Sequence, residues 1–200
     1  HLTAHPPALT ATRRQPTFFA QAGWKTVAGP WPLWVSVRRA EYVLVGEGWD
    51  EATRLTATRQ ALGLVALDAT AAQTDIPWHL RDSWPPSIAH AAQRLRAHFV
   101  REDKWAHDYM WTDIVPLADD VARSDFVTFA PHAYDAIIWA GGEVLTTLVG
   151  EVTSLVVALT DEQRDVLEAD VGLGHVVTLT EWRERHPSAL RRLLQRLYIR

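Results

Sequence analysis

Histidine and carboxylate side chains recur at helical spacing in two parts of this 200-residue chain. Asp103 lies one helical turn before His107, and His132 lies a similar distance before Asp135. Residues at these spacings share one face of a helix, so each pair could point to one site. Imidazole and carboxylate groups are ligands for divalent metals. If the two helices face each other, Asp103, His107, His132 and Asp135 predict a metal site.

The two pairs resemble the carboxylate–histidine sites of di-metal helical bundles, where Glu-x-x-His pairs project from facing helices. The resemblance implies a metal-dependent helical enzyme, to which Glu143 could contribute a further carboxylate. The alternative is that both pairs are local, with Asp103 paired to a neighbouring basic residue and His132 lying in a first helical turn. We favour this alternative, which requires no cofactor.

A second arrangement uses Arg101 and His107, which are separated by five residues. This spacing is similar to the Arg/His motif of HEPN-type helical ribonucleases. The resemblance implies that His107 transfers a proton and that Arg101 stabilises the charge of a phosphorane. The residue after the arginine is Glu102, which departs from the motif. A chain with nine histidines and many arginines also produces this spacing by chance.

The C-terminal residues 181–200 are basic, because six arginines against two glutamates give a net charge of +4. The order of helix, strand, helix and basic helix around VVTLTEWRERHPSALRRLLQRL is similar to a winged-helix DNA-binding domain. The resemblance implies that the second helix of a helix–turn–helix enters the major groove and that arginines contact phosphates or base edges. These arginines are Arg183, Arg185, Arg191, Arg192 and Arg196.

The same segment has an alternative interpretation as an amphipathic helix. Leu190, Leu193, Leu194 and Leu197 follow the i, i+3, i+4, i+7 spacing of a buried stripe. They would then pack on the core while the arginines face water. The short connection at His186-Pro187 also departs from the usual helix–turn–helix turn.

Tryptophan is the unusual component, with ten residues against five phenylalanines and four tyrosines. Tryptophan is favoured at binding hot spots and needs a partner for its indole N–H when buried. We expect residues 24–49 and 78–84 to fold over the core as aromatic lids, above a site for a protein partner or a small apolar ligand. The predicted ligand-binding residues are Trp78, Trp84, Trp105, Trp111 and Trp139.

The apolar pattern predicts a mainly α, single-domain helical bundle around a long central helix at 132–159. Helices at 50–73, 87–103 and 161–170 are expected to pack around it, with a further helical stretch at 105–124 that is interrupted near Pro116. Gly141-Gly142 is interpreted as a bend in the central helix or as a place where a neighbouring element approaches closely. The predicted helix N-caps are Asp50, Thr160 and Thr180, and Gln163 would complete a capping box with Thr160. Small β elements are expected at 33–46 and 175–179, although the first could equally be one buried helix.

The domain organisation predicted from composition is simple. Residues 1–16 form a flexible lead-in, and residues 17–200 form one helical domain in which 160–200 could be a basic C-terminal subunit. The apolar segment 137–159 contains Glu143 and Glu151, which disfavour a membrane span. We expect a cytoplasmic bacterial protein that does not bind membranes and could form oligomers.

The absence of cysteine excludes disulfides, thiolate zinc sites and cysteine nucleophiles. The chain also lacks phosphate-binding glycine loops and the common hydrolase motifs. The leading hypothesis is therefore a non-catalytic binding or regulatory protein with a tryptophan-rich helical scaffold. The alternatives are a nucleic-acid-binding regulator acting through residues 181–200, and a helical enzyme centred on Arg101, Asp103, His107 and His132.

Overall fold

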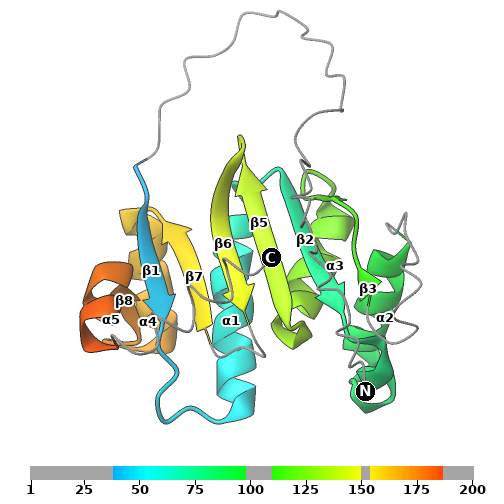
Figure 1. Cartoon of the computed structure of the whole chain (residues 1–200), viewed down its shortest axis with the longest axis horizontal. Helices are drawn as coiled ribbons and strands as arrows, with labels where there is room; N and C mark the ends of the chain where they lie inside the picture. Colours follow the sequence, from blue (N-terminus) through cyan, green and yellow to red (C-terminus); the bar gives the residue numbers. More distant parts are fainter. Residues whose placement is uncertain (1–37, 98–109, 150–153, 187–200) are drawn as a thin grey trace, which may run out of the picture. The chain divides into compact units, whose positions relative to one another are not determined.

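An antiparallel sheet of eight strands forms the centre of the described structure (Figure 1). The computed structural model describes residues 38–97, 110–149 and 154–186, all of which belong to one unit of the chain, Val37–Arg200. The strands are β1 (Ala40–Leu44), β2 (Ala71–Ile76), β3 (Met110–Trp111), β4 (Val115–Pro116), β5 (Asp135–Ala140), β6 (Glu143–Val149), β7 (Ser154–Leu159) and β8 (Val176–Thr178). The helices are α1 (Glu51–Ala66), η1 (Trp78–Ser83), α2 (Pro86–Arg96), α3 (Asp120–Phe129), η2 (Ala130–His132), α4 (Asp161–Val171) and α5 (Leu179–Arg185).

The strand order is β3-β2-β5-β6-β7-β1-β8, and β4 also pairs with β2. Strands β5, β6 and β7 form a meander. Strand β1 lies between β7 and β8, which both come from the C-terminal part of the chain. The C-terminal part 160–186 is therefore joined to the same sheet through β8.

The expected central helix at 132–159 is wrong, because this segment contains the meander β5-β6-β7. Gly141 and Gly142 have φ values of 58° and 91° and connect β5 to β6. Two successive residues with positive φ cannot continue a right-handed helix, and they suit a tight hairpin turn. The flanking segments are rich in β-branched residues, which favour strands. The protein is thus a mixed α/β fold and not a mainly α helical bundle.

Two other helix predictions need correction. The helix expected at 50–73 ends at Ala66, and Ala71–Ile76 forms β2. The stretch predicted to be helical at 105–124 contains β3, β4 and the start of α3 within its described part. Strands β3 and β4 both pair with β2. Strand pairing between segments that are distant in the sequence leaves little local signal.

Several local predictions are confirmed. Asp50 caps α1 by accepting a 2.8 Å hydrogen bond from the Thr53 amide. Thr160 and Gln163 form a reciprocal capping box at the start of α4. Strands β1 and β8 lie within the segments 33–46 and 175–179 that were expected to contain β structure.

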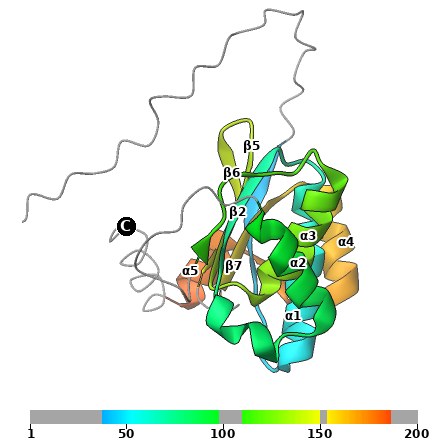
Figure 2. The same cartoon turned by 90° about the vertical axis from the view of Figure 1, so that its right-hand side faces the viewer.

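Helices α1 to α4 lie on one side of the sheet, and α5 lies on the other side (Figure 2). The main core lies between the sheet and the first group of helices, around Leu62, Phe126, Phe129, Ile138 and Leu148. A small second cluster lies on the opposite face, where Leu179 and Trp182 of α5 pack on Val43, Val156 and Val177.

The helices within the described ranges are all too short or too polar to cross a bilayer, since α1 has 16 residues and a span needs about 20 apolar ones.

Candidate ligand-binding site around Arg54

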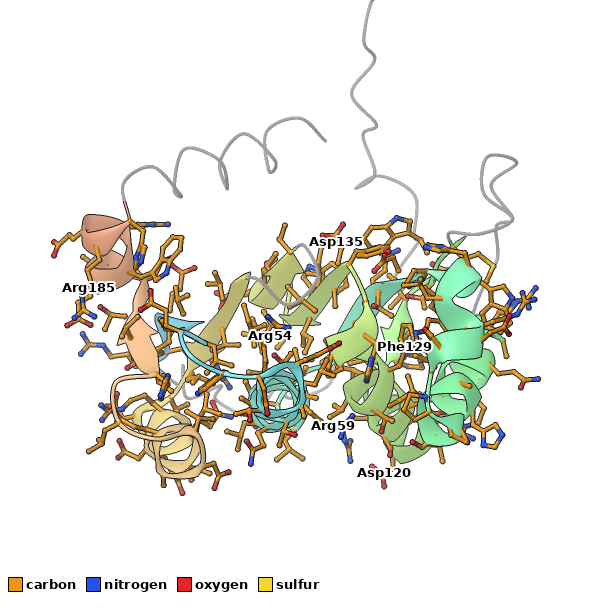
Figure 3. The ribbon with its side chains drawn as sticks, turned by 90° about the horizontal axis from the view of Figure 1, so that it is seen from below. Arg54, Arg59, Asp120, Phe129, Asp135 and Arg185 are labelled. Carbon is orange, nitrogen blue, oxygen red and sulfur yellow. The ribbon has the colours of Figure 1, made fainter. Side chains whose placement is uncertain are left out.

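Several predicted site residues lie outside the described ranges. They are Arg101, Asp103, Trp105, His107, Arg191, Arg192 and Arg196. The proposed ribonuclease-like pair and half of the proposed metal site therefore stay predictions. Arg183 and Arg185 are described, and both are exposed on α5. Figure 3 labels Arg185.

The second His/Asp pair does not lie on a helix as expected. His132 ends η2, and Asp135 begins β5, where its backbone N–H donates to the Asp75 carboxylate. The Asp135 side chain lies on the sheet face opposite α1 to α4 (Figure 3). Within the described parts of the chain, no group of three or more histidine and acidic residues could hold a metal ion.

The described tryptophans of the predicted binding set occupy two places. Trp78 and Trp84 lie next to each other, with ring centroids 6.3 Å apart, and Trp84 packs edge-on against Phe129 of α3. Trp111 and Trp139 belong to the sheet, in β3 and β5, with β2 between these two strands. Trp84 is the member of this set that lines a described cavity.

Two cavities adjoin the N-terminal half of α1. The larger cavity has a volume of about 440 Å³, and its walls include Trp84, His132 and Tyr134. The smaller cavity has a volume of about 280 Å³, and its walls include Trp49 and Trp182. Ligand pockets usually measure about 300–1,000 Å³, so the larger cavity is big enough for a small organic molecule.

Arg54 lines both cavities and projects from α1 toward the sheet (Figure 3). Its Nε is shielded from solvent and has no hydrogen-bond acceptor among residues 38–97, 110–149 and 154–186. No described carboxylate lies within salt-bridge distance of its guanidinium. Arg54 is therefore a half-buried cation without a counter-charge in the described structure.

Thr58 follows Arg54 by one helical turn and lines the smaller cavity. Its side chain is fully buried, and its hydroxyl has no partner in the described structure. A buried hydroxyl without a partner is costly, because it has lost its hydrogen bonds to water. Arg54 and Thr58 thus present unsatisfied donors in the wall of one cavity.

His132 contributes a neutral imidazole to the larger cavity. Burial lowers the pKa of His132 from its usual value near 6.5, and the cation of Arg59 lowers it further. The carboxylate of Glu51 has the opposite, smaller effect on this pKa. At pH 7 the imidazole can therefore donate one hydrogen bond and accept another without adding charge.

Two tryptophans that line the smaller cavity, Trp49 and Trp182, each contact a histidine ring. The rings of Trp49 and His175 have centroids 4.6 Å apart, and those of Trp182 and His186 are stacked at 5.1 Å. The His186 Nε2 lies 3.8 Å from the Glu47 carboxylate. The walls of the smaller cavity thus come from three distant parts of the chain.

Arg54 is absent from the site residues predicted from sequence, although the sequence contains a signal for it. Arg54, Thr58, Ala61 and Val65 have the i, i+4, i+7, i+11 spacing of one helical stripe. The last three are buried in the core, so the stripe places an arginine on the inner face of α1. A charged residue on a buried stripe is a candidate functional residue.

Comparisons of the chain with models of known protein families, with curated protein sequences and with solved structures gave no significant match.

Proposed function

We propose that this protein binds a small ligand that has an anionic group and an aromatic or aliphatic body, with Arg54 as the anchor. The observation that carries the proposal is the half-buried guanidinium of Arg54, which lines two cavities and has no counter-charge among the described residues. This proposal retains the leading hypothesis from sequence, that the chain is a non-catalytic binding protein.

The Nε of Arg54 is shielded from water and has no hydrogen-bond acceptor among the described residues. An N–H group that loses water without gaining an acceptor is unfavourable, so a carboxylate or phosphate that bonds to it in the cavity would be favourable. Arginine also binds such groups in a bidentate manner, which adds geometric specificity. The rings of Trp84 and Tyr134 in the larger cavity would contact the apolar body of the ligand.

The test uses indole-3-acetate and phenyl phosphate as anionic probes and indole-3-acetamide as the neutral counterpart. We expect both anions to raise Tm in a saturable manner and the amide to have a much smaller effect. Arg54→Met should abolish the rise with the anions. Arg38→Met is the matched control, because Arg38 is exposed and lies outside both cavities.

Two results would contradict the proposal. One is that neither anion binds at millimolar concentration, and the other is that Arg54→Met binds them as well as the unmodified protein does. Isothermal titration calorimetry would check that the change in Tm reflects binding.

The other expectations from sequence stay predictions. Nucleic-acid binding through residues 181–200 is supported by the exposed Arg183 and Arg185. It would weaken steeply with salt if the arginines contact phosphates. The enzyme centred on Arg101 and His107, the oligomer and the cytoplasmic location also await a test.

A further inference from the structure

Two threonines of α1, Thr56 and Thr58, differ in how their hydroxyl groups are satisfied. The Thr56 hydroxyl donates a 2.9 Å hydrogen bond to the carbonyl oxygen of Ala52, one turn earlier in the helix. Such a bond within the helix is the common way for a threonine there to satisfy its hydroxyl. The Thr58 hydroxyl has no partner among the described residues, although Thr58 is fully buried. Thr58 therefore keeps a buried hydroxyl available for another acceptor.

The surroundings of Thr58 in the smaller cavity are largely apolar. Leu44 and Leu155 line this cavity, and they are buried and paired across β1 and β7. Trp49 and Trp182 add two aromatic rings to its walls. A buried hydroxyl without a partner is unfavourable, and a valine of the same shape would avoid this cost. An acceptor that enters the cavity would also remove it.

Arg54 presents a second unsatisfied donor in the same wall. It lies one helical turn before Thr58, so the two side chains share one face of α1. Figure 3 shows Arg54 projecting from α1 toward the sheet. The Arg54 Nε and the Thr58 hydroxyl both lack an acceptor within the described ranges. A guanidinium can only donate hydrogen bonds and a hydroxyl can donate one, so the pair fits the oxygens of an anion.

The other polar side chains of the smaller cavity favour a single negative charge. Among the described residues that line it, these are Glu47 and His186, whose Oε1 and Nε2 atoms lie 3.8 Å apart. The Glu47 carboxylate repels a phosphate monoester, which carries close to two negative charges, more strongly than it repels a carboxylate. A phosphate also has three terminal oxygens that need donors, whereas a carboxylate has two.

We propose that the anionic group of the ligand is a carboxylate, held in the smaller cavity by the Arg54 guanidinium and the Thr58 hydroxyl. This inference rests on the proposed function and adds the position and the chemical class of the anionic group. Thr58 determines specificity, because its hydroxyl donates to a carboxylate oxygen. Arg54 also lines the larger cavity, so the body of the ligand extends past Arg54 toward Trp84 and Tyr134.

Thr58→Val tests this role, because valine has the shape of threonine without its hydroxyl. Without ligand, we expect the Tm of Thr58→Val to equal or exceed that of the unmodified protein, since the unsatisfied hydroxyl is removed. The affinity for phenylacetate, measured by isothermal titration calorimetry, should fall at least about tenfold, because a hydrogen bond to a charged group is lost. A structural role alone would not move stability and affinity in opposite directions.

Two further variants provide matched controls. Thr58→Ser keeps the hydroxyl and should bind phenylacetate within about threefold of the unmodified protein. Thr56→Val removes an exposed hydroxyl outside both cavities and should leave the affinity unchanged.

Phenyl phosphate is the comparison ligand, because it has the same ring and is mostly a dianion at about pH 7.5. We expect the unmodified protein to bind phenylacetate at least about tenfold more tightly than phenyl phosphate.

Three results would overturn the inference. They are equal affinity of Thr58→Val and the unmodified protein for phenylacetate, phenyl phosphate binding that is as tight as phenylacetate binding, and a lower Tm for ligand-free Thr58→Val. In each case, loss of binding in Arg54→Met would leave the proposed function intact. If the unmodified protein binds neither ligand, the proposed function fails together with the inference.

Discussion

The carboxylate of Asp75 in β2 accepts a 2.8 Å hydrogen bond from the backbone N–H of Asp135, the first residue of β5. The backbone pairing of these strands ends at Thr74 and Ala136, so the side chain extends the ladder by one more bond. Asp75 is fully buried and Asp135 is 9% exposed. This bond fixes the start of β5 at the position where the chain leaves η2.

We predict that Asp75→Ala lowers the free energy of unfolding by about 1–3 kcal/mol, because it leaves the buried Asp135 N–H without this acceptor. Asp75→Asn keeps an oxygen at the same position and should cost less. Urea unfolding of the two variants measures the difference. Equal destabilisation by both would show that the hydrogen bond does not stabilise the junction.

The ion pair between α2 and α3 gives a second prediction. The Arg94 guanidinium donates to both carboxylate oxygens of Asp125, at 2.7 and 2.5 Å. The Asp125 side chain is 7% exposed, whereas that of Arg94 is 57% exposed. Arg94→Met would leave a buried carboxylate without this partner, and we expect Tm to fall by a few degrees.

Arg183→Met provides the control for this loss of charge, since Arg183 is exposed on α5. Calorimetry of both variants under the same buffer conditions tests the prediction. A Tm for Arg94→Met that matches the control would mean that the pair contributes nothing to stability.

The stability of the protein should depend on the protonation of His132. Its pKa is lower in the folded state than its usual value near 6.5, because burial and Arg59 disfavour the charged imidazolium. Below about pH 6.5 the unfolded chain therefore binds more protons than the folded chain at this residue, and stability falls as pH falls. The loss stops once the pH is below the folded-state pKa.

The prediction is that His132→Gln has a smaller decline in unfolding free energy between pH 7.5 and pH 5 than the unmodified protein has. Because the chain has nine histidines, the difference between the two proteins is the quantity to measure. Parallel curves for the two proteins would contradict the proposed role of His132.

Replacement by alanine should change the stability of the protein in opposite directions at two glycines, Gly142 and Gly63. Gly142 has a φ of 91° in the β5–β6 turn, so Gly142→Ala forces a side chain into an unfavourable conformation and should cost about 1–2 kcal/mol. Gly63 lies within α1, where an added Cβ would meet Val127 at an ordinary 3.8 Å. Gly63→Ala should stabilise the protein by about 0.5–1 kcal/mol.

Denaturant unfolding of the two glycine variants compares them directly. If Gly142→Ala were neutral, the turn would tolerate a negative φ. If Gly63→Ala were destabilising, the packing of α1 on α3 would be tighter than the structure indicates.

Local sequence signals were sufficient for part of the fold. Asp50 and the Thr160–Gln163 pair each satisfy helix amides within a few residues, so the start of α1 and of α4 can be predicted without tertiary information. The start of α5 was displaced by two residues, because Thr178 caps it and not Thr180. The sequence contains the distinguishing signal, because Thr178 has Glu181 three residues later, at the capping-box spacing, whereas Thr180 has Arg183 there.

The meander was missed for an identifiable reason. Glu143 and Glu151, together with Thr147 and Ser154, have a spacing that also fits one helical stripe, so the segment 132–159 matched a long helix. Short apolar runs do not separate strand from helix. The Gly141-Gly142 pair and the abundance of β-branched residues were the signals that favoured a hairpin.

The sequence alone determined the caps of α1 and α4 and the short strand at β8, because each depends on neighbours a few positions away. The tertiary structure decided the sheet and the surroundings of Arg54. Strand β1 pairs with β7 and β8, more than 100 residues later in the chain, and the smaller cavity joins Arg54 to Trp182. Such contacts depend on the burial of distant segments together, so no local pattern contains them.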